Sequence, residues 1–133
     1  MTTILIVDDD ASIRKFLKHC LENLSYHVIE AANGKEAVAM MSLQHPKLVI
    51  TDIIMPEKEG FDTIFELRRI DPNLKIIAMS GGGMAHSEAY LNIAKELGAH
   101  YTIEKPIERK ALIEAIVALL SDSGENATEV KEE

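Results

Sequence analysis

Four apolar segments of the sequence are each followed by side chains that could take part in phosphoryl chemistry. In chain order, these side chains are Asp8 with Asp9 and Asp10, then Asp52, Ser80 and Lys105. Clustered carboxylates repel one another and favour a divalent cation, and a ligand set of oxygen atoms suits Mg2+. Phosphoryl transfer needs a nucleophile, a cation and further donors, and a carboxylate can be the nucleophile. If the fold brings these groups together, they could transfer a phosphoryl group to an aspartate.

The elements that must position these groups follow from the hydrophobic pattern. Short apolar runs predict β-strands at residues 4–7, 26–30, 48–51, 75–79 and 101–103. A first helix is predicted from apolar residues spaced three and four apart, namely Ile13, Phe16, Leu17, Cys20, Leu21 and Leu24. Later helices are expected at about residues 35–44, 61–70, 87–97 and 107–120. Strands therefore alternate with helices along the whole pattern.

Two of the later helices have apolar faces that can be stated residue by residue. The helix at 87–97 carries Tyr90, Ile93, Ala94 and Leu97 on one face. It closes at Gly98, which is a typical C′ glycine. The helix at 107–120 is expected to bury Ile113, Ile116, Val117 and Leu120.

Alternation of strands and helices predicts an α/β domain with a doubly wound, five-stranded parallel sheet. Residues 4–7, 48–51 and 75–79 are nearly continuous apolar runs, as expected for strands covered on both faces. In such a sheet, functional groups collect at the carboxyl ends of the strands. The acids, the hydroxyl and the amine are therefore expected along one edge of the sheet.

Each of these residues also has an ordinary structural explanation. The acids at 8–10 could cap the first helix and favour its positive end. Ser80 could be a turn residue, and Lys105 a solvated charge. The occurrence of all of them at successive strand ends favours a shared site.

Composition limits the other classes of function. The chain has 133 residues, enough for one domain, and 47% of them are hydrophobic. The formal charge is −8, which disfavours direct binding to nucleic acids or to anionic membranes. No apolar run approaches the roughly 18 residues of a membrane span, and the first residues do not resemble a signal peptide. We therefore expect a cytoplasmic protein.

The single cysteine and the last residues contribute no chemistry to this site. Cys20 cannot form an intrachain disulfide, and its place on the apolar face of the first helix predicts a buried, inert thiol. Residues 121–133 hold five acids and one lysine. We expect residues 1–120 to form the domain and residues 121–133 to be a disordered acidic tail.

The motifs together resemble the receiver domains of two-component response regulators, the CheY-like family. The resemblance spans about residues 3–120 and depends on the full ordered set of motifs. These are Ile-Leu-Ile-Val-Asp8-Asp9, Asp52-Ile-Ile-Met-Pro56, Ser80 after a buried strand, and Lys105-Pro106. The family implies a flavodoxin-like (βα)5 fold with strand order 2-1-3-4-5. It also implies phosphorylation of Asp52 in a Mg2+-dependent reaction.

The resemblance also implies a role for each site residue. Within the acidic triplet, Asp8-Asp9 or Asp9-Asp10 could be the metal pair. In this family an Arg usually follows the second acid of the metal pair by five residues. Arg14 fits Asp9 as that second acid, so the pair is expected to be Asp8-Asp9. Mg2+ would be bound by Asp9, Asp52 and the backbone carbonyl of Ile54, with Asp8 acting through water. Ser80 and Lys105 would contact the phosphoryl oxygens, a cis peptide would join Lys105 to Pro106, and Asp10 or Ser12 would remain as a helix cap.

The expected partners also follow from the resemblance. A sensor histidine kinase or a histidine phosphotransfer protein would donate the phosphoryl group. A downstream protein target would recognise the phosphorylated surface around the fourth helix, the fifth strand and the fifth helix. The domain would act as a monomer or as a phosphorylation-dependent dimer. It would catalyse its own phosphorylation and hydrolysis without being a metabolic enzyme.

Two departures from the family pattern concern the signalling step. The family usually has an aromatic residue three positions before its lysine, where this chain has Thr102; Tyr101 lies one position earlier. Adjacent strand residues point to opposite faces, so Tyr101 is not expected to replace the switch residue without a bulge. Ser80 is also followed by three glycines at 81–83, which predicts a mobile loop. No G-x-G-x-x-G or P-loop pattern is present, so these glycines do not indicate a nucleotide cradle.

Two other functions compete with a phosphoacceptor. An aspartate-nucleophile phosphohydrolase usually needs an acid two residues after the nucleophile, where this chain has Ile54. A phosphorylation-independent interaction module of the same fold is favoured by Thr102 and disfavoured by the complete set of acids and lysine.

Overall fold

The chain forms one sheet with helices on both faces. The computed structural model describes residues 1–53, 59–81 and 87–121. Its strands are β1 (Thr3–Val7), β2 (His27–Ala31), β3 (Leu48–Asp52), β4 (Lys75–Ser80) and β5 (Tyr101–Glu104). Its helices are α1 (Ala11–Glu22), α2 (Gly34–Gln44), α3 (Glu59–Ile70), α4 (Ser87–Glu96) and α5 (Arg109–Ser121). The expected acidic tail lies, from residue 122 on, outside the described residues.

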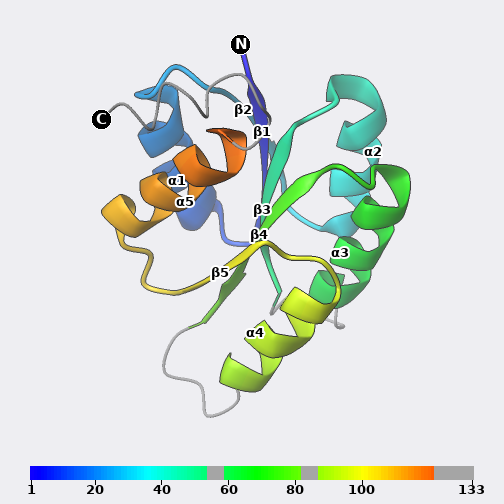
Figure 1. Ribbon diagram of the computed structural model, residues 1–133. Helices are drawn as coiled ribbons and strands as arrows, with labels where there is room; N and C mark the ends of the chain where they lie inside the picture. The colour runs from blue at the N-terminus through cyan, green and yellow to red at the C-terminus, as the bar shows by residue number, and fades with distance from the viewer. Residues whose placement is uncertain (54–58, 82–86, 122–133) are drawn as a thin grey trace.

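All the strand pairs of the sheet are parallel, in the order β2-β1-β3-β4-β5. Figure 1 shows α1 and α5 on one face of the sheet, and α2, α3 and α4 on the other. This arrangement confirms the predicted doubly wound fold and its strand order. It places β1, β3 and β4 in the middle of the sheet, with their carboxyl ends at one edge.

Alternating side chains of the central strands build a separate core on each face. Under α2, α3 and α4, the sheet contributes Leu5, Val7, Val49, Ile76 and Ala78. Under α1 and α5, it contributes Ile4, Ile6, Leu48, Ile50, Ile77 and Met79. Every one of these residues is fully buried, which explains why the central strands are continuous apolar runs. The two cores thus pack against the central strands from both faces.

The predicted face of the last helix is wrong by about one position. In α5 the buried residues are Leu112, Ala115, Ile116 and Leu119. Val117 was expected to be buried but is 39% exposed, and only Ile116 of the predicted set is fully buried. The helix has apolar residues on most of its circumference, so a spacing of three and four fits more than one face. Packing on the sheet selects the face that includes the small residue Ala115.

Three other residues assigned to apolar faces are also partly exposed. Phe16 on α1 is 41% exposed, and Ile93 on α4 is 42% exposed. Leu24 lies beyond the end of α1 and is 39% exposed. Cys20, in contrast, is buried as a free thiol. Within the described ranges, no helix is long and apolar enough to cross a membrane.

Candidate functional site

The carboxyl ends of β1, β3 and β4 present buried polar residues. Asp8 follows β1 with none of its surface exposed, and its backbone N–H donates to the carbonyl of Ala31 at the end of β2 (3.1 Å). Asp52 ends β3 and is 4% exposed, while Ser80 ends β4 and is fully buried. Carboxylates are seldom buried in a folded domain, so two of them together with a buried hydroxyl at neighbouring strand ends indicate a functional site.

Three carboxylates meet at this edge of the sheet. One oxygen atom from each of Asp8, Asp9 and Asp52 lies within 4.8 Å of the other two. Asp10 has a different role, because its side chain accepts a hydrogen bond from the Ser12 N–H (2.8 Å) and caps α1. The geometry therefore brings the first two acids of the triplet together with Asp52.

Lys105 joins two of these acids. Its ammonium lies 2.9 Å from Asp8 Oδ2 and 3.1 Å from Asp52 Oδ2. Burial alone would lower the pKa of this ammonium, but the hydrogen bond to Asp8 and the charges of Asp52 and Asp8 outweigh it and raise the pKa above 10.5. Lys105 is thus a cation at neutral pH, and it cannot by itself balance three carboxylates.

The segment that carries Lys105 is tied to β4. The Lys105 N–H donates to the carbonyl of Ser80 (2.7 Å), and the Lys105–Pro106 peptide bond is cis. This contact extends the pairing of β4 with β5 by one residue, since Ser80 is opposite Glu104. The lysine is therefore placed by the backbone of the neighbouring strand.

The Ser80 hydroxyl is buried and has no hydrogen-bond partner among the described residues. A buried polar atom without a partner costs about 1–3 kcal/mol, and most native hydroxyls avoid that cost. An oxygen atom of a bound group could supply the missing partner. The three carboxylates also fit a hard divalent cation, because all their donor atoms are oxygens.

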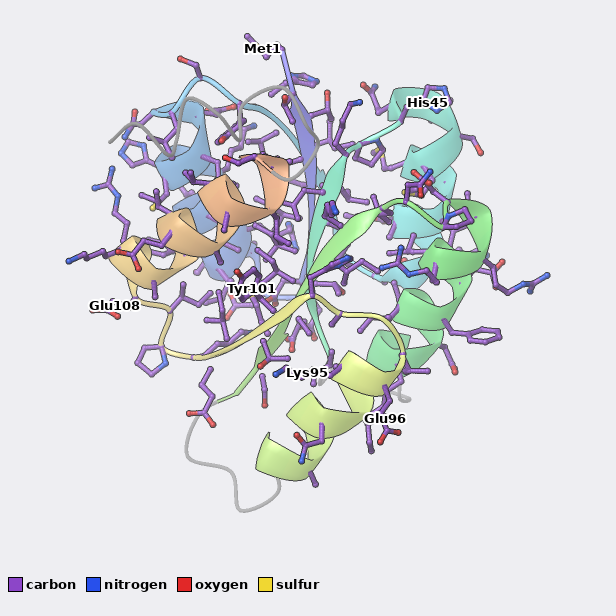
Figure 2. The ribbon with its side chains drawn as sticks, viewed as in Figure 1. Met1, His45, Lys95, Glu96, Tyr101 and Glu108 are labelled. Atoms are coloured by element: carbon purple, nitrogen blue, oxygen red, sulfur yellow. The ribbon has the colours of Figure 1, made fainter. Side chains whose placement is uncertain are left out.

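Thr102 and Tyr101 lie on opposite faces of β5, as expected from their order in the sequence. Thr102 pairs with Ala78, whose side chain belongs to the core under α2, α3 and α4. Tyr101, labelled in Figure 2, pairs with Ile77, whose side chain belongs to the core under α1 and α5. No bulge interrupts this register. Tyr101 is 39% exposed and does not occupy the position of the family's aromatic residue.

Some expectations cannot be located in the structure. The backbone carbonyl of Ile54 and the glycines at 82 and 83 lie outside the described residues. Gly81 is described, and a Cβ atom there would meet nothing within 4 Å. One residue that sequence reasoning missed is Glu30, next to the last residue of β2, which pairs with Arg14 beside the acidic turn formed by residues 8–10. A single acid in a weak strand gave no signal for this contact.

The family of the chain is shown by a match to the model of the response regulator receiver domain, over residues 4–117. The chain belongs to this family of two-component signalling domains. The chemotaxis protein CheY of Thermotoga maritima is 41% identical over 85% of this chain and 92% of that protein. The solved CheY-like receiver domain of Methanospirillum hungatei is 30% identical, with a TM-score of 0.81, over 92% of this chain and 95% of that one.

Other relatives are longer proteins. The probable transcriptional regulator ycf27 of Cyanophora paradoxa is 38% identical over 88% of this chain, but the match covers 47% of that regulator. The chain thus spans about half the length of the ycf27 relatives that it matches. Membership of the receiver family makes this chain a signalling domain rather than a metabolic enzyme.

Proposed function

We propose that this domain accepts a phosphoryl group on Asp52 in a Mg2+-dependent reaction, from a histidine kinase or a histidine phosphotransfer protein in the cytoplasm. The observation that carries the proposal is the meeting of Asp52 with two further carboxylates and with the Lys105 ammonium. Asp52 combines burial at the end of the central strand with an adjacent cation.

The chain's own residues divide the work. Asp9, Asp52 and the backbone carbonyl of Ile54, which lies outside the described residues, would hold Mg2+, and Asp8 would act through water. The bound cation would neutralise oxygens of the phosphoryl group. A carboxylate oxygen of Asp52 attacks phosphorus and forms a P–O bond, while the P–N bond of phosphohistidine breaks and its electron pair returns to the imidazole. The product is an acyl phosphate on Asp52.

Lys105 and Ser80 stabilise this product. The Lys105 ammonium already contacts Asp52, so it is placed to pair with a phosphoryl oxygen once the acceptor is modified. The Ser80 hydroxyl would donate to another oxygen and gain the partner that it lacks among the described residues. These two contacts would draw Ser80 and Lys105, and with them the ends of β4 and β5, toward the phosphoryl group.

The change would be read by a downstream protein on the surface of α4, β5 and α5. Each of these elements exposes a large apolar side chain, namely Ile93, Tyr101 and Val117. Phosphorylation adds charge at the site and biases the elements that carry these side chains. The surface would bind its target as a monomer or form a phosphorylation-dependent dimer.

The proposal is tested by intact-mass spectrometry after incubation with acetyl phosphate and Mg2+. We expect a gain of one phosphoryl group in the wild type, and no gain in Asp52→Asn or when the metal is chelated. A gain that persists in Asp52→Asn would place the acceptor elsewhere. No gain in any sample, together with no trapping by beryllium fluoride, would favour the phosphorylation-independent interaction module.

A further inference from the structure

We propose that Arg14, itself held by Glu30, is a positioning residue that sets the Mg2+ affinity of the acidic turn. The inference rests on the proposed Mg2+ site and extends it to two residues that do not belong to the carboxylate cluster. The Arg14 guanidinium donates from Nη1 to the backbone carbonyl of Asp8 (2.7 Å). From Nε it donates to Glu30 Oε1 (3.1 Å).

The carbonyl that Arg14 holds belongs to the peptide group between Asp8 and Asp9. The orientation of that peptide group determines how the two acidic side chains leave the backbone. On its other side, the Asp8 N–H donates to Ala31, which follows Glu30 in β2. Asp8 is therefore held at its N–H by Ala31 directly, and at its carbonyl by Arg14, which is itself held by Glu30.

Glu30 fixes Arg14 in turn. Its second oxygen lies 3.5 Å from the Lys18 ammonium, one turn further along α1. The Arg14 side chain is 19% exposed and that of Glu30 is 33% exposed, so this is a partly buried network. Two donors on a planar guanidinium fork fit two acceptors in a fixed geometry, which a lysine cannot reproduce. Residues that orient metal ligands in this way typically contribute 10–100-fold to metal affinity.

The sign of the effect separates positioning from simple charge. Arg14 is a cation near a cation site, so its charge alone opposes Mg2+ binding. Removing the charge would then tighten binding, whereas loosening the acidic turn would weaken it. Arg14→Gln tests these opposite expectations, and Arg14→Lys keeps the charge while losing the fork.

The measurement is isothermal titration calorimetry of Mg2+ against the wild type and the two variants. We expect Arg14→Gln and Arg14→Lys each to raise the Mg2+ dissociation constant about tenfold. Glu30→Gln is expected to weaken binding in the same direction, and non-additively with Arg14→Gln, because both act through one contact. Far-UV circular dichroism before each titration shows that the variant is folded.

The matched control is Arg69→Gln. Arg69 also pairs with a glutamate, Glu66, at 3.6 Å, but this pair is exposed on α3. Its loss should leave Mg2+ affinity unchanged. Unchanged or tighter binding in folded Arg14→Gln and Arg14→Lys would overturn the inference. If Arg14→Gln does not fold, Arg14→Lys alone decides it. Failure of the wild type to bind Mg2+ would instead contradict the proposed function.

Discussion

The ammonium of Lys105 lies 3.1 Å from the carboxylate of Asp52, although the two residues are 53 positions apart in the chain. The contact forms because β3, β4 and β5 are parallel neighbours whose carboxyl ends lie at one edge. A second contact, to Asp8 at 2.9 Å, makes the lysine the bridge between two strand ends. This bridge explains how two buried carboxylates coexist before any cation or phosphoryl group arrives.

Replacement of Lys105 by methionine should destabilise the metal-free domain. Asp8 and Asp52 would keep their buried charges and lose their partner, at a cost of about 2 kcal/mol in the free energy of unfolding. Mg2+ should restore part of that loss, because it supplies positive charge at the same carboxylates. Urea unfolding with Mg2+ and with a chelator measures both effects. Lys47→Met is the control, since Lys47 is exposed and forms no ion pair with a described residue.

Replacement of Asp9 by asparagine should stabilise the metal-free domain. Asp9 is exposed and adds a third negative charge to Asp8 and Asp52. Its neutralisation relieves repulsion, so the melting temperature of the metal-free variant should rise above that of the wild type. The same variant should lose the increase in melting temperature that Mg2+ gives the wild type by mass action. Differential scanning calorimetry with and without Mg2+ would show this crossover, and equal Mg2+ responses would argue against Asp9 as a ligand.

The raised pKa of Lys105 predicts a loss of stability at high pH. Its pKa is raised in the folded state, so the unfolded chain loses the proton first as the pH rises above 10.5. The stabilisation from Lys105 is therefore fully present at neutral pH and declines as the pH passes through the folded pKa. We expect the difference in unfolding free energy between the wild type and Lys105→Met to be constant up to about pH 10 and then to shrink. A difference that declines between neutral pH and pH 9 would contradict this assignment.

Gly34 should not tolerate alanine, although it begins a helix. A Cβ atom at Gly34 would overlap Thr63 Oγ1, where α2 meets α3. Alanine normally stabilises a helix by about 1 kcal/mol over glycine, but overpacking costs about 1–3 kcal/mol. Gly34→Ala should therefore lower the free energy of unfolding. In a Thr63→Ala background the overlap with Oγ1 is removed and only the tight contact with the Cβ of residue 63, at 3.3 Å, remains. The same change should therefore cost less in that background, which chemical denaturation of the four proteins in the cycle can measure.

The sequence predicts the sheet and the edge that holds the site because both depend on local patterns. Strands covered on both faces need continuous apolar runs, and such runs precede Asp8, Asp52 and Ser80. A parallel sheet then places these residues at one edge without knowledge of any contact. The strand order confirms that part of the reasoning.

The sequence does not predict features that depend on three-dimensional packing. The buried face of α5 includes Leu112 and Ala115 because the sheet selects one of several apolar faces. The pairing of Arg14 with Glu30 joins a helix to a weak strand 16 positions away, and neither residue type is specific for such a contact. The local order of Tyr101 and Thr102, in contrast, was sufficient to assign them to opposite faces, because strand alternation is a local rule.

The most direct test of the account is the identity of the phosphorylated residue. Sodium borohydride reduces an acyl phosphate to an alcohol, so treatment of the phosphorylated domain should convert the acceptor aspartate to homoserine. Tandem mass spectrometry of peptides would then locate homoserine in the sequence. We expect it at position 52, only in samples that received both acetyl phosphate and Mg2+. Homoserine at position 8 or 9, with Asp52 unmodified, would contradict the assignment of Asp52 as the nucleophile.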